Sequence, residues 1–182
     1  LGLLKLIEKN NLDKNHISAY HIGFVLGPCL NAGGRLQTAQ LALSLLLADN
    51  EGEADFMAQK LKELNDQRKD MTKKGVEEAS AQVDENYRQD KVLVVYLPTC
   101  HESLAGIIAG RLREKYQKPA FVLTDGEESV KGSGRSIEAY HMFHALTEVP
   151  HLLLKFGGHP MAAGLSLRKE NVDEFRRQLN EN

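Results

Sequence analysis

Four glycine-containing segments of this 182-residue sequence place a cationic or imidazole side chain where the backbone is accessible. Glycine lets a backbone approach a ligand closely, and arginine, lysine and histidine donate hydrogen bonds to anionic oxygens. Such a combination is typical of phosphate contacts. Because it recurs four times, the sequence predicts a protein that binds a nucleic-acid backbone. The segments are residues 27–36, 100–106, 131–136 and 157–164.

The first segment, GPCLNAGGRL at residues 27–36, offers Asn31 and Arg35 as candidate contacts. The forked guanidinium of Arg35 suits phosphate or carboxylate, and the Asn31 amide can accept or donate a hydrogen bond. The alternative is ordinary turn chemistry before a helix.

The second segment, CHESLAG, follows a predicted buried strand and precedes a predicted helix. Ligands of α/β sheets gather at the carboxyl ends of strands, near helix N-termini that attract anions. His101 is therefore a candidate ligand, and a loop or helix-capping histidine is the alternative. The small residues at 105, 106, 109 and 110 predict close packing of the helix on the sheet.

The third segment, KGSGRS at residues 131–136, combines two glycines, two hydroxyls and two cations. We expect an edge strand that runs into a tight turn, whose backbone amides form a nest for an anion. The alternative is a plain hairpin turn. The spacing is not that of a phosphate-binding loop of nucleotide hydrolases. Its candidate contacts are Lys131, Ser133, Arg135 and Ser136.

The fourth segment, GGHPMAAG, gives the most specific signal in the sequence. Gly157 and Gly158 present His159 beside a proline that fixes the turn, and small residues follow where a polymer could pass. We expect a glycine-rich loop that leads into the last strand.

The elements predicted to carry these segments begin with helices. Apolar spacing predicts a short helix over residues 1–10, and another from Thr38 to a stop at Asn50 and Gly52. Between them, residues 16–35 mix apolar residues with glycine and proline, which predicts an extended segment and loop. Residues 53–87 predict one long helix with a narrow apolar stripe, interpreted as a connector between two bodies. A surface helix of a single domain is the alternative.

The second half of the sequence predicts an α/β domain. VLVVYL and AFVLTD read as buried strands on either side of a helical stretch, which predicts parallel pairing with a right-handed crossover. Two short helical patterns and a last strand follow. We therefore expect a mixed, mostly parallel sheet flanked by helices and preceded by the long helix.

Composition limits these interpretations. The net charge of −2 lacks the basic excess usual in nucleic-acid binders, so a domain without a polyanionic partner is an alternative. Cys29 and Cys100 show no metal-ligand spacing, and we expect reduced thiols. No apolar run predicts a membrane helix and no leader is recognisable, which favours a cytoplasmic protein. Because Leu1 lies within a helical pattern, we expect an excised part of a longer protein.

In this order, GPCLNAGGRL, CHESLAGIIAGR, KGSGRS and FGGHPMAAGLSL resemble the RecJ-type exonucleases specific for single-stranded DNA. The last three segments are similar to the DHHA1 domain, the substrate-binding partner of the catalytic DHH domain in that family. The resemblance implies that residues 1–50 end the DHH region, residues 51–89 form the connector helix, and residues 90–182 form the DHHA1 domain. Family members usually carry a basic residue at the position of Cys29 and an aromatic residue at that of Cys100.

The resemblance implies a 5′-to-3′ exonuclease of recombination and repair that uses Mn²⁺ or Mg²⁺ held by an upstream DHH domain. This sequence contains no Asp-His-His triplet, so we expect no catalytic residue, no bound metal and no activity in the isolated chain. Single-stranded DNA and the upstream DHH domain are the expected partners, with single-strand binding protein a further one and no membrane. The implied substrate contacts are Asn31, Arg35, His101, Lys131, Ser133, Arg135, Ser136, Gly157, Gly158 and His159.

Two other functions fit part of these observations. One is a non-catalytic nucleic-acid-binding module of the DHHA1 type. The other is a DHH-group phosphoesterase for short oligonucleotides or cyclic dinucleotides, against which the first segment and the long helix argue.

Overall fold

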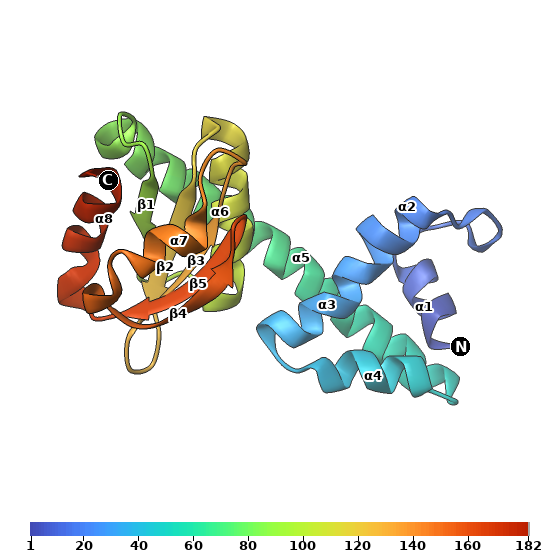
Figure 1. Cartoon of the computed structure of the whole chain (residues 1–182). Helices are drawn as coiled ribbons and strands as arrows, with labels where there is room; N and C mark the ends of the chain where they lie inside the picture. Colours follow the sequence, from blue (N-terminus) through green and yellow to red (C-terminus); the bar gives the residue numbers. More distant parts are fainter. Residues whose placement is uncertain (182) are drawn as a thin grey trace. The chain divides into compact units, whose positions relative to one another are not determined.

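The computed structural model describes residues 1–181 and divides the chain into two compact units, Leu1–Met71 and Thr72–Asn182 (Figure 1). The long helix α5 (Glu51–Gln82) contributes to both units. A short π-helical segment, η3 (Val83–Tyr87), continues it. The long helix was thus predicted from the spacing of its apolar residues.

The first unit is helical. Its elements before α5 are α1 (Gly2–Lys9), η1 (Lys14–His16), α2 (Ala19–His21), η2 (Ile22–Leu26), α3 (Gly27–Leu36) and α4 (Ala39–Leu47). Its core gathers apolar side chains from α1, η2, α3, α4 and α5, including Leu6, Leu26, Leu45 and Leu61. Asn50 caps the start of α5, because its Oδ1 accepts a hydrogen bond from the Glu53 amide at 3.0 Å. The helix predicted from Thr38 is α4, which ends at Leu47, shortly before the expected stop at Asn50, whereas Gly52 lies within α5.

The prediction of an extended segment and loop over residues 16–35 is also wrong, because α2, η2 and α3 form helical structure there. Pro28 lies in the first turn of α3, where the missing amide hydrogen of proline is tolerated. Gly33 is needed for close packing, since a Cβ atom there would lie 3.0 Å from Leu61 Cδ2 and 3.1 Å from the Thr38 carbonyl. Gly33, which resembles a helix breaker in the sequence, thus allows α3 to pack closely against α5.

The second unit contains a five-stranded sheet with the order β1-β2-β3-β5-β4. Its strands are β1 (Leu93–Tyr96), β2 (Ala120–Asp125), β3 (Val130–Arg135), β4 (Leu153–His159) and β5 (Ala162–Leu167). The pair β1 and β2 is parallel and is joined through α6 (Glu102–Tyr116), as predicted. The remaining pairs are antiparallel. The mixed α/β fold is confirmed, whereas the mostly parallel sheet is wrong.

Both glycine-rich segments of the second unit belong to strands. Residues 130–135 form β3, an interior strand paired with β2 and β5, so neither the edge strand nor the tight-turn nest exists. The predicted loop at residues 157–159 is the end of edge strand β4, which turns directly into β5. Backbone pairing of neighbouring strands outweighs the low strand preference of glycine at these positions.

Helices cover the two faces of the sheet differently. On one face, α7 (Met142–Thr147), η4 (Pro150–Leu152), η5 (Lys169–Asn171) and α8 (Val172–Glu181) accompany a core that contains Phe121, Leu123, Met142 and Phe175. On the other face, α6 lies against β2 and β3 (Figure 1). The α6 face of β4 and β5 carries exposed residues, among them Lys155, Gly157, His159 and Gly164. We call this side of β3, β5 and β4, which begins at α6 and extends to the edge strand β4, the open face.

Candidate functional site

The alternating direction of side chains along β3 places the glycines of the third segment on one face of the sheet and its other strand residues on the opposite face. Successive side chains of a strand point to opposite faces of the sheet. Gly132 and Gly134 face the core, since a Cβ atom at Gly134 would lie 2.6 Å from Phe121 Cε1. Lys131, Ser133 and Arg135 therefore face the open side, beside α6.

Arg135 is held beneath α6. Its Nη1 donates a hydrogen bond to the Gly134 carbonyl at 2.8 Å. A Cβ atom at Gly106 would lie only 2.8 Å from Arg135 Nη2 and 3.4 Å from Ser133 Oγ. The glycine at 106 thus leaves room for the guanidinium, which supports the predicted close packing of this helix on the sheet.

Strand pairing brings the fourth segment to the same face. Arg135 pairs with Ala162, which pairs with His159. Two residues before Arg135 on β3, Ser133 pairs with Gly164, which pairs with Gly157. The structure therefore places predicted contacts from residues 131–136 and 157–159 together, although about twenty residues separate them in the sequence.

A cavity of about 300 Å³ lies between the first turn of α6 and the open face. Glu102 and Ser103 of the helix line one side of it, and Lys131, Ser133 and Gly164 line the other. Its polar donors come from the lysine and the hydroxyl groups, which can bind an anionic oxygen.

His101 caps α6. Its Nδ1 accepts a hydrogen bond from the Ser103 amide at 3.3 Å and lies 2.8 Å from Ser103 Oγ. The cap orients the exposed ring, so the other nitrogen, Nε2, is the one that can bind a ligand. The two interpretations of His101, cap and ligand, are therefore compatible.

A second cavity of about 710 Å³ contains both His101 and Lys131. Its lining is mainly acidic, with Glu102, Asp125, Glu127 and Glu128. Carboxylates repel a polyanion, so this cavity is a poor place for phosphate. We therefore expect a bound phosphate backbone to stay outside this cavity, at the edge of the open face.

Two predicted contacts have structural roles instead. Ser136 is fully buried, and its Oγ donates a hydrogen bond of 2.6 Å to the Tyr140 carbonyl. Gly158 has a φ of +155°, and a Cβ atom there would collide with the Ala162 carbonyl oxygen. Both face the core side of the sheet, so the prediction that Ser136 contacts substrate conflicts with its position.

Asn31 and Arg35 lie on α3 in the first unit, and both side chains are exposed. The charge of Arg35 also affects Arg68 on α5. Burial, and then the nearby Arg35 charge, lower the pKa of Arg68. Arg68 Nε donates to the buried Asn65 Oδ1 at 3.2 Å. The sequence prediction missed this second arginine, which the structure places in the same electrostatic environment as Arg35.

Cys29 is fully buried between two asparagines. Its Sγ donates to Asn10 Oδ1 at 3.7 Å and accepts from Asn65 Nδ2 at 3.4 Å. Burial raises the pKa of the thiol, which keeps it protonated. Cys29 and Cys100 are free cysteines, and Cys29 is too deep to contact a phosphate.

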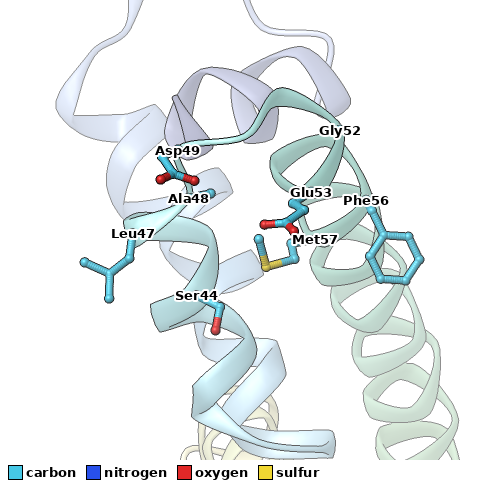
Figure 2. A pocket seen from close by; sticks show the side chains of 8 residues that line it. All are labelled: Ser44, Leu47, Ala48, Asp49, Gly52, Glu53, Phe56 and Met57. Atoms are coloured by element: carbon cyan, nitrogen blue, oxygen red, sulfur yellow. The ribbon is translucent and has the colours of Figure 1, made fainter.

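A groove of the first unit lies between α4 and α5 and contains none of the predicted contacts. Figure 2 shows Glu53 and Met57 between the two helices, with Leu47 and Phe56 projecting outward. Leu47 and Phe56 are 73% and 70% exposed. The residues that line this groove include the carboxylates of Asp49 and Glu53 and no cation, so the groove is a poor place for phosphate.

Residues 1–181 contain neither a metal-ligand cluster nor a membrane-spanning helix. No three histidine, cysteine, aspartate or glutamate side chains in this range are grouped as a metal site would require. Likewise, none of the helices formed by these residues has the length and apolar character needed to cross a bilayer.

The structure adds Gly106, Lys155 and Gly164 to the surroundings of the predicted contacts. Lys155 lies two and four residues before Gly157 and His159, so alternation puts all three on the open face. This spacing is visible in the sequence, but it becomes informative only when residues 153–159 are recognised as a strand.

Comparison with known proteins identifies relatives over the whole chain. Residues 89–182 match the family model of the DHHA1 domain. The single-stranded-DNA-specific exonuclease RecJ of Salmonella typhimurium is 39% identical over 99% of this chain and 33% of its own length. RecJ of Bacillus subtilis is 37% identical over 100% of this chain and 23% of its own length. The chain thus spans a third or less of these relatives.

Solved structures agree. RecJ from Thermus thermophilus, crystallised with Mg²⁺, matches with a TM-score of 0.86 and 30% identity over 99% of this chain and 28% of its own. A structure of exonuclease RecJ bound to manganese matches with a TM-score of 0.87 and 29% identity, and the match covers 99% of this chain and 44% of that protein's chain.

Proposed function

The chain belongs to the DHHA1 family, and we propose that it is the substrate-binding part of a RecJ-type exonuclease that degrades single-stranded DNA. One observation carries the proposal. The fold brings Lys131, Ser133, Arg135 and His159 to one open face beside exposed glycines. Cations and hydroxyls around accessible backbone favour the phosphates of a polymer without reading its bases.

The contribution of these residues to catalysis is positioning and charge neutralisation. Arg135 and Lys131 would offset phosphate charge, and Ser133 would donate a hydrogen bond, while glycines let the strand approach. In the longer protein we propose that Mn²⁺ or Mg²⁺ is held by the DHH domain and supplies the activated water. This chain would then be inactive alone.

We propose that residues 1–50 end the catalytic DHH region, residues 51–89 form the connector and residues 90–182 form the DHHA1 domain. The exposed apolar side chains of the first unit support a contact with further protein, since such patches commonly mark interfaces. They include Leu43, Leu46, Leu47 and Phe56. The cellular role would be 5′-to-3′ digestion in recombination and repair in the cytoplasm, with single-strand binding protein as a partner.

The test uses Arg135→Ala and His159→Ala in the full-length protein. Each should lower the rate of single-strand digestion at least about tenfold, because a lost charged contact is worth roughly 1.5–3 kcal/mol. Lys91→Ala is the matched control, since Lys91 is exposed and precedes β1 at the opposite edge of the sheet from β4. Unchanged circular dichroism would show that the variants fold.

Two results would contradict the proposal. If both variants digest single-stranded DNA at the wild-type rate, the assignment of Arg135 and His159 as substrate contacts is wrong. Hydrolysis of DNA by the isolated chain with added Mn²⁺ would show that it contains its own catalytic centre.

A further inference from the structure

Three cross-strand rows on the open face form a pattern that the predicted contacts do not explain alone. The first row is Arg135, Ala162 and His159, and the last is Lys131, Ser166 and Lys155. The middle row is Ser133, Gly164 and Gly157. A row of minimal side chains thus lies between two rows that carry cations or histidine. We call the middle row the trough.

The trough is open at its glycines. A Cβ atom at Gly157 would meet nothing within 4 Å, and one at Gly164 would meet only the Gly132 carbonyl at 3.9 Å. Both glycines are exposed. Packing therefore does not require glycine at either position, unlike at Gly134 or Gly158, and a ligand that needs the space would explain both.

The two lysines of the last row differ from three cations of the second unit that are held by carboxylates. Arg176, Arg177 and Lys169 form ion pairs with Asp173, with Glu174 and Glu181, and with Asp125. Among residues 1–181, neither Lys131 nor Lys155 forms such a pair. Their charge is available to a ligand on the open face.

The dimensions fit a phosphodiester backbone. Strands lie about 4.8 Å apart, so the trough crosses three strands over roughly 10 Å. Its flanking rows are four residues apart on β3, or about 14 Å at roughly 3.4 Å per residue. The exposed lysines of the last row are long enough to reach a phosphate in the trough, and His159 borders it on the other side.

We propose that a phosphodiester backbone crosses the sheet in this trough, and that Lys155 is a further substrate-positioning residue that contacts a phosphate together with Lys131. The proposal rests on the proposed function, because it specifies how the same open face holds its strand. It explains the exposed glycines, and it predicts binding that is insensitive to base sequence.

The first test measures binding of the chain to a fluorescent oligothymidylate of roughly 12 nucleotides by anisotropy. Lys155→Ala should weaken binding about fivefold or more, and should lower the slope of log affinity against log salt by about 0.7 for one lost phosphate contact. The control Lys91→Ala should leave both quantities unchanged. A merely structural effect of Lys155 would not change the salt slope.

The second test fills the trough. Gly164→Ala adds a methyl group that the fold accommodates, and should weaken binding about threefold or more because the backbone can no longer approach as closely. Gly23→Ala is the control, because a Cβ atom there meets nothing within 4 Å and Gly23 belongs to the first unit.

The outcomes separate the two proposals. If Arg135→Ala weakens binding while Lys155→Ala and Gly164→Ala behave as their controls, the trough is wrong and the proposed function stands. If the trough variants weaken binding and Arg135→Ala does not, the assignment of Arg135 is wrong and the trough stands. If the wild-type chain binds no oligothymidylate, both are overturned for this chain.

Discussion

The two faces of the sheet in the second unit use the same residue types for opposite purposes. On the core face, Gly132 and Gly134 leave space for Leu123, Leu165, Phe121 and Met142. On the open face, Gly157 and Gly164 border empty space. A glycine beside a cation therefore indicates a ligand only where no protein atom needs the space, and strand alternation decides which face a residue joins.

The largest expected effect distinguishes the adjacent glycines of β4. Gly158→Ala should lower the free energy of unfolding by about 3 kcal/mol or more, because its φ of +155° and the Ala162 carbonyl exclude a side chain. Gly157→Ala should change it by less than about 1 kcal/mol. Urea denaturation measures both free energies of unfolding. Equal losses in the two variants would contradict the claim that Gly158 is packed against protein atoms and Gly157 is not.

A smaller effect is expected within β3. Gly134→Ala should lower the free energy of unfolding by about 2 kcal/mol, because the new methyl group would overpack Phe121 and Met142, which are fully buried. The variant Gly164→Ala serves as the comparison, because Gly164 follows Ala163, the β5 partner of Gly134, and faces the open side. It should have the same free energy of unfolding as the wild type. A Gly134→Ala protein of wild-type stability would show that the core face is loosely packed.

The smallest effect compares two serines of opposite face. Ser136→Ala should cost about 1 kcal/mol of stability, because the Tyr140 carbonyl loses its buried donor. Ser133→Ala should leave stability within about 0.5 kcal/mol and weaken oligothymidylate binding instead. Thermal unfolding and anisotropy together measure both variants. Weaker DNA binding by Ser136→Ala at unchanged stability would restore Ser136 as a substrate contact.

Much of the fold could be predicted from local pattern. The apolar stripe of α5, the buried runs of β1 and β2, and the crossover through α6 follow from periodicity, which depends on near neighbours in the sequence. The helix α3 could not be predicted, because its glycines and proline look like breakers until Leu61 of α5 is seen against Gly33. The glycines of β3 and β4 are ambiguous in the same way: they predict an edge strand with a tight turn and a glycine-rich loop, whereas pairing with distant strands makes β3 an interior strand and residues 157–159 the end of β4.

The candidate site was predicted in its residue types more than in its geometry. Arg135, Ser133 and His159 stand out by their glycine neighbours, whereas Lys155 and Gly164 gain meaning only through pairing with β5 and β3. Ser136 looked equivalent to Ser133 in the sequence. The two serines are an odd number of positions apart, however, so in extended backbone they face opposite sides.

By itself, the sequence determined the mixed α/β class, the long helix and the order of four segments that mark the RecJ and DHHA1 relationship, because each is encoded by local residue types and spacing. Only the tertiary structure decided which glycines are open and which are filled. That distinction depends on atoms contributed by strands and helices far along the chain, which no local pattern records.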